Sequence, residues 1–98
     1  MKELPKSITV NGRRWRLIWL PRGHPLLDDG IGRVEAPDTK GKRMFIAMGQ
    51  TPSDLHDTLL HEIAHASGWN LSEEWVATFA EDVTRIMKRL GYKFISIK

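Results

Sequence analysis

The chain has 98 residues, 41% of them hydrophobic, which suffices for one domain with a single modest core and excludes a second domain. It contains no cysteine, so disulfides and thiolate metal sites are excluded, and any metal must bind to histidine and carboxylate. The net charge of +3 arises in residues 1–50, which hold ten basic and five acidic residues, against five and seven in residues 51–98.

The basic first half of the chain has two interpretations. Lysine and arginine along a sheet edge discourage pairing between molecules, and we favour this interpretation. A surface for nucleic acid is the less favoured alternative, in which Trp15 among Arg13, Arg14 and Arg16 would stack on bases.

Hydropathy along the chain argues against a membrane partner. Residues 1–15 include no apolar run long enough for a signal peptide, and no stretch reaches the roughly 20 apolar residues of a membrane span. The sequence therefore predicts a cytoplasmic protein.

Short strands separated by turns are predicted for residues 1–50. Ser7–Val10 leads into Asn11 and Gly12, a strong hairpin signal, and residues 14–20 then place Trp15, Leu17 and Trp19 on one face of a second strand. Residues 21–32 contain two prolines and three glycines, which indicates a loop. Further strands are expected at residues 31–35 and 44–48, giving three or four strands in all.

Two helices are predicted after the strands. Residues 51–68 form the first, with Thr51 as N-cap, Pro52 in the first turn and Gly68 at its end. Residues 70–91 hold the second, capped by Asn70 or Ser72, and residues 92–98 follow as a tail or short strand. The prediction is a single α+β domain over residues 1–98, with a small sheet followed by two helices.

An HExxH motif, His61-Glu62-Ile63-Ala64-His65, lies inside the first predicted helix. Residues four apart on a helix lie one above the other, so both imidazoles can offer a nitrogen to one metal ion. Glu62 points roughly 100° away from His61, which predicts a proton acceptor for a water molecule activated by the metal, and not a ligand. The alternative is a pair of ordinary, partly buried helix histidines.

A third ligand is expected on the second helix, because catalytic zinc usually has three protein ligands and one open position. Two adjacent glutamates, Glu73 and Glu74, begin that helix. Its apolar face centres near Val83 and Met87, which favours Glu73, but crossing helices can touch through other sides of their first turns. The residues alone leave both glutamates open.

Residues 74–81, Glu-Trp-Val-Ala-Thr-Phe-Ala-Glu, resemble the glutamate helix of gluzincin metallopeptidases. The size of the chain and the order of strands, HExxH helix and glutamate helix also resemble the minigluzincins and small metallopeptidase-like proteins of phages and prophages. The resemblance implies a zincin-like domain with Zn²⁺ held by His61, His65 and Glu74. It also implies that residues 44–48 form the edge strand that holds an extended peptide or protein substrate.

The chain departs from the family pattern in three respects. Only eight residues separate His65 from Glu74, so a tight turn at Gly68 must join the helices. Thr78 stands where the family often has an acidic residue that orients a histidine. Neither Tyr92 nor His24 can be assigned as the group that stabilises an oxyanion.

The function predicted from these features is zinc-dependent hydrolysis of peptide bonds, as in a metalloendopeptidase, with Glu62 as general base and acid. The alternative is a catalytically silent or latent zincin-fold protein that binds a partner, such as a regulatory or phage accessory factor. In a latent form, residues 92–98 would fold across the cleft, as similarity to the minigluzincins suggests.

Overall fold

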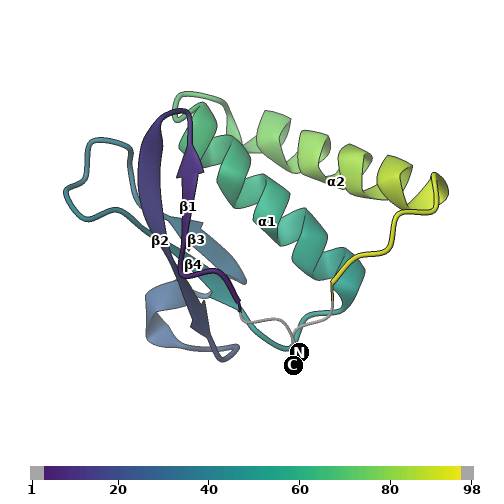
Figure 1. Ribbon diagram of the computed structural model, residues 1–98, viewed down its shortest axis with the longest axis horizontal. Helices are drawn as coiled ribbons and strands as arrows, with labels where there is room; N and C mark the ends of the chain where they lie inside the picture. The colour runs from purple at the N-terminus through teal and green to yellow at the C-terminus, as the bar shows by residue number, and fades with distance from the viewer. Residues whose placement is uncertain (1–3, 96–98) are drawn as a thin grey trace.

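The computed structural model describes residues 4–95 and contains a four-stranded sheet followed by two helices, which confirms the predicted α+β fold (Figure 1). The elements are β1 (Ser7–Val10), β2 (Arg13–Leu20), a short 3-10 helix η1 (Pro25–Leu27), β3 (Gly32–Val34), β4 (Arg43–Ala47), α1 (Pro52–Ser67) and α2 (Glu73–Arg89). Neither helix has the length and apolar character that a bilayer crossing requires, among the residues described.

The sheet is mixed, with the strand order β1-β2-β4-β3. β1 and β2 form the predicted antiparallel hairpin, with Asn11 and Gly12 in the left-handed region at φ 51° and 77°. β2 and β4 run parallel, whereas β3 and β4 run antiparallel. β3 is therefore an edge strand, and β4 is internal.

The position of β4 corrects the expectation that residues 44–48 form the substrate-holding edge. β4 pairs with β2 on one side and β3 on the other, so its backbone groups are already used. Met44 and Ile46 pack into the core on the helix side, while Phe45 and Ala47 pack with Leu27 on the opposite face. An unbroken apolar run is typical of a strand buried on both faces.

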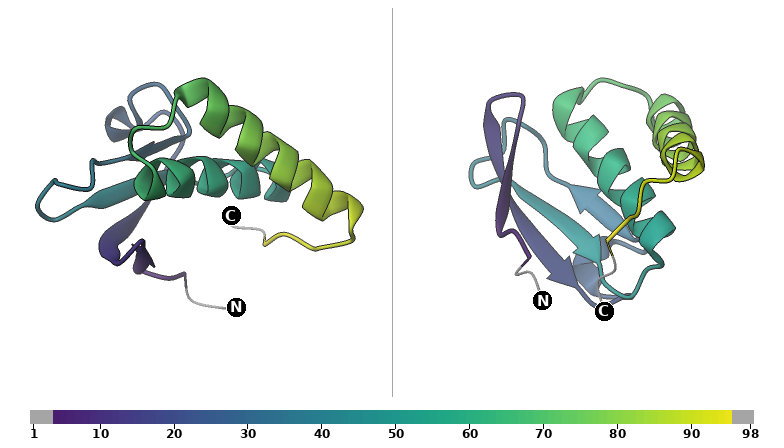
Figure 2. Two further views of the ribbon diagram at one scale, coloured as in Figure 1. Left: turned by 90° about the horizontal axis from the view of Figure 1, so that it is seen from above. Right: turned by 45° about the vertical axis from the view of Figure 1, so that its right-hand side comes forward.

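The molecule is built in layers, with α1 lying between the sheet and α2 (Figure 2). Leu55 and Ala66 of α1 join the core with Trp15, Leu17 and Met44 of the sheet. α2 packs mainly on α1, and Val76, Ala80 and Thr84 are its buried residues. The side of α2 that faces away from α1 is consequently left to solvent.

Local signals define both helices. The Thr51 hydroxyl accepts from Asp54 N at 3.2 Å and begins α1, and the Ser72 hydroxyl accepts from Trp75 N at 3.0 Å and begins α2. Ser72, rather than Asn70, is thus the cap of the second helix, which makes Glu73 its first residue.

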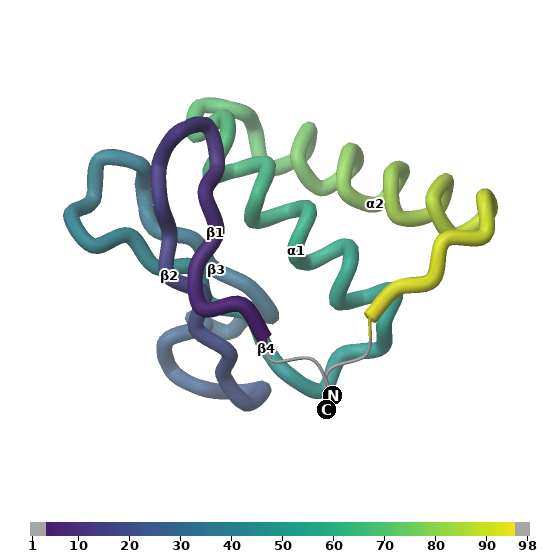
Figure 3. Tube along the Cα trace, in the orientation of Figure 1, coloured from purple at the N-terminus to yellow at the C-terminus, as the bar shows by residue number. Residues whose placement is uncertain are grey.

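The segment after α2 returns toward the start of α1 (Figure 3). Residues 92–95 adopt no regular structure, and Phe94 stacks on His56 with ring centroids 4.1 Å apart. His56 lies on a different side of α1 from His61, because five residues turn a helix by about 500°, or 140° net. Phe94 therefore contacts the flank of α1 away from the HExxH histidines. Residues 96–98 of the predicted tail lie outside the described residues.

Candidate metal centre

His61 and His65 on α1 and Glu73 on α2 converge on one point. Glu73 Oε1 lies 2.6 Å from His61 Nε2, and Glu73 Oε2 lies 2.7 Å from His65 Nε2. The two imidazole rings meet edge to face, with centroids 4.9 Å apart. One ligand atom from each residue lies within 4.8 Å of the other two, so the group could hold a metal ion.

The carboxylate at this point is that of Glu73, whereas the family resemblance implied Glu74 as the third ligand. As the first residue of α2, Glu73 projects toward α1. Glu74 lies about 100° further around the helix, where it lines a separate surface hollow with Thr78 and Phe79. Thr78 therefore does not lie where it would support a histidine, and the glutamate that lies beside the histidines is the one that the apolar face of α2 favoured.

The donor set and its freedom to move fit a zinc ion. Two imidazoles and one carboxylate are the protein ligands of many catalytic zinc sites. The Glu73 oxygens lie within hydrogen-bond distance of both imidazole nitrogens, so they would have to move back for an ion to enter between the three groups. The Glu73 side chain is 71% exposed, which leaves it free to do so.

The two histidines lower the pKa of Glu73 through hydrogen bonds and charge. Partial burial raises the pKa of Glu73, but the hydrogen bond from His65 and the charge of His61 outweigh it and hold this pKa below its ordinary value. The carboxylate therefore stays ionised, as a metal ligand must be.

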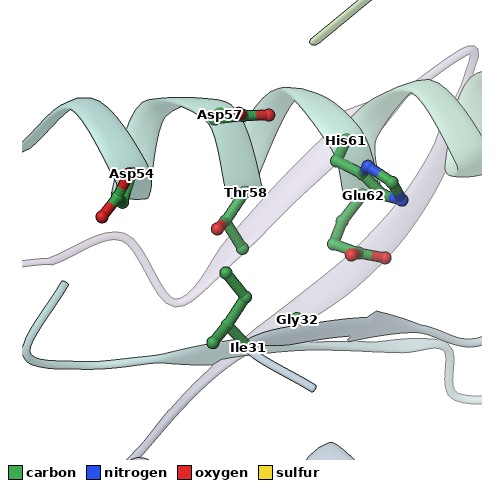
Figure 4. A pocket seen from close by; sticks show the side chains of 7 residues that line it. All are labelled: Ile31, Gly32, Asp54, Asp57, Thr58, His61 and Glu62. Carbon is green, nitrogen blue, oxygen red and sulfur yellow. The ribbon is translucent and has the colours of Figure 1, made fainter. Parts of the chain in front are cut away.

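Glu62 lies beside the histidines but not among the three converging groups. Its side chain points from α1 toward β3, and the residue is only 7% exposed (Figure 4). Burial raises the pKa of Glu62 to about 7, and the nearby charge of Glu73 contributes to the rise. A carboxyl group with such a pKa can accept and return a proton near neutral pH.

Two hollows meet at His61 and Glu62 and form a cleft between α1 and β3. One, of about 280 Å³, is lined on its far side by Asp54, Asp57 and Thr58 of α1 and Ile31 before β3 (Figure 4). The other, of about 490 Å³, extends past Glu73 to residues 33–34, Trp69 and Leu71. Neither Tyr92 nor His24 lines either hollow.

Gly32 on β3 permits the close approach of the strand to the helix. A Cβ atom at this position would lie 2.8 Å from Thr58 Cγ2 and 2.9 Å from Glu62 Oε2. The sequence alone assigns no role to Gly32, because this role arises only from the packing of β3 against α1. A glycine inside a predicted strand was the available signal, since such glycines often mark a close backbone approach.

We expect Gly32→Ala to destabilise the fold by about 1–3 kcal/mol, the usual cost of overpacking. Urea unfolding measures this loss. Thr58→Ser removes the methyl group nearest the new Cβ but keeps the hydroxyl that donates to Gln50 Oε1 at 2.7 Å. The double variant should recover part of the loss; a double variant that merely adds the two costs would contradict the proposed contact.

The tryptophans have separate roles. Trp15 is fully buried, and its indole N–H donates to the carbonyl oxygen of Glu35 at 3.0 Å, so it is not available for stacking on bases. Trp69 and Trp75 are about half exposed. The proposed nucleic-acid surface around Trp15 therefore lacks its aromatic element.

Comparison of the chain with known proteins does not assign it to a family. No protein-family model, no curated protein and no solved structure matches the chain.

Proposed function

We propose that the protein is a zinc-dependent peptidase in which His61, His65 and Glu73 hold the ion and Glu62 transfers protons. One observation carries the proposal: the three ligand atoms converge in a cleft that is also lined by Glu62, a buried glutamate. A purely structural site has no use for a proton acceptor beside it.

The proposed reaction uses two sets of side chains, one that holds the metal ion and one that transfers protons. His61, His65 and Glu73 would hold the ion, and a zinc ion bound there would supply a Lewis acid and lower the pKa of water toward 7. Glu62 would accept a proton from the attacking water and pass it to the leaving amine. Its burial keeps bulk water from competing for that proton.

β3 is the proposed support for the substrate. β3 lies at one edge of the sheet and, within residues 4–95, pairs with β4 alone, so its other side can pair with an extended peptide. Gly32, His61 and Glu62 line both hollows, so a peptide paired with β3 would have a peptide bond beside the reacting groups. Side chains on either side of that bond would enter the two hollows.

Zinc-dependent cleavage of a mixture of unfolded proteins tests the proposal. The protein is stripped with a chelator, reloaded with one equivalent of zinc, and incubated with a mixture of unfolded proteins, and mass spectrometry identifies new termini. We expect cleavage only in the reloaded sample. Zinc bound at one per chain without any cleavage would instead support the alternative of a silent partner-binding protein.

The choice between the two glutamates makes a sharper prediction. Glu73→Ala removes a direct ligand and should weaken zinc binding by at least about 100-fold, more than the loss of a group that only orients a ligand. Glu74→Ala is the matched control one residue away and should leave the affinity unchanged. Competition with a chromophoric chelator measures both, and the reverse order of effects would refute the site.

A further inference from the structure

The outer face of α2 is apolar and has no covering element among residues 4–95. Trp75, Phe79, Ile86 and Leu90 are 50%, 41%, 49% and 69% exposed. Their spacing of four, seven and four residues places them on one side of the helix. Trp75 and Phe79 stack with centroids 5.1 Å apart, so they present one continuous aromatic surface. We call this stripe of four residues the outer face.

Charge along the same helix divides cleanly into two halves. Residues 69–82 contain four acidic residues, Glu73, Glu74, Glu81 and Asp82, and no basic one. Residues 83–98 contain five basic residues and no acidic one. The helix thus has an acidic first half and a basic second half, and its outer face runs the length of both.

We propose that the outer face of α2 is covered by α2 of a second copy of the chain, in antiparallel orientation about a two-fold axis near Asp82. Such an interface uses the same patch on both partners. Phe79 of one copy then faces Ile86 of the other, and Trp75 faces Leu90. The acidic half of each helix lies against the basic half of its partner.

Charge complementarity selects the occupant and its direction. In antiparallel pairing, the acidic half of α2 in one copy lies against the basic half of α2 in the other, so the helix is suited to pair with a second copy of itself. Parallel pairing would set acidic residues against acidic ones and basic residues against basic ones. Asp82 interrupts the apolar stripe near the axis, and its carboxylate accepts from Arg85 Nη2 at 2.7 Å. That ion pair lowers the repulsion between the two Asp82 side chains at the centre of the dimer.

Concentration-dependent self-association tests the proposal. Sedimentation velocity of the full chain should show a monomer–dimer equilibrium. The acidic-helix variant, Arg85→Glu with Arg89→Glu, and the basic-helix variant, Glu74→Lys with Asp82→Lys, should each weaken dimerisation by at least about tenfold. Mixing the two variants should restore a dimer containing one copy of each.

Two controls keep the outcome decisive. Arg14→Glu with Lys40→Glu reverses two exposed charges on the sheet side of the molecule and should leave dimerisation unchanged. Circular dichroism verifies that every variant is folded. A wild-type chain that stays monomeric at its highest soluble concentration would overturn the proposal, and so would a helix variant that dimerises as strongly as the wild type.

Discussion

Glu62→Gln is expected to lower peptide hydrolysis by about 10²–10⁴-fold, the usual contribution of a general base and acid. Glutamine keeps the size of the side chain beside Gly32 but cannot accept the proton from water. Zinc stoichiometry should stay unchanged, because Glu62 is not one of the three converging groups. Steady-state kinetics on a peptide cleaved by the wild-type protein measures the loss.

The matched control for this loss is Glu81→Gln, the same substitution at an exposed position on α2. Its kcat should equal that of the wild type. Full activity in a zinc-loaded Glu62→Gln protein would eliminate Glu62 as the proton carrier and with it the proposed mechanism.

Glu62→Gln should also stabilise the metal-free protein against unfolding, and only at higher pH. Burial raises the pKa of Glu62 from 4.5 to about 7, so below pH 4.5 both folded and unfolded chains carry the proton. As pH rises from 4.5 to 7, the unfolded chain ionises first, and the wild type loses about 3 kcal/mol of stability. Glutamine cannot ionise, so the variant avoids this loss.

Urea unfolding in a chelator at pH 4.5 and pH 8 measures the effect. The free energy of unfolding of Glu62→Gln should exceed that of the wild type by about 3 kcal/mol at pH 8 and by little at pH 4.5. Glu81→Gln should show no such difference between the two pH values. An equal effect of Glu62→Gln at both values would mean that ionisation of Glu62 does not oppose folding.

The elements of the fold were predictable because their signals are local. Asn11 and Gly12 define the hairpin, and Thr51 and Ser72 begin the helices through hydrogen bonds to residues three positions on. The pairing of His61 with His65 follows from helix geometry alone. These features depend on few residues, all close in sequence.

The third ligand and the edge strand depend on how distant elements pack. Whether Glu73 or Glu74 reaches the histidines depends on where α2 starts and how it crosses α1, and the structure brings Glu73 to them where the family resemblance implied Glu74. The edge position of β3 depends on strand order, which no local pattern encodes. The unbroken apolar run of β4 nevertheless already indicated a strand enclosed on both faces.

The layered arrangement has a consequence for how the domain holds together. Two of the converging side chains belong to the middle layer and the third to the outermost helix, which packs mainly on α1. An ion at this point would act as a removable crosslink between layers in a chain that has no disulfide. Loss of the ion would then loosen the attachment of α2 and dismantle the reaction centre in a single event.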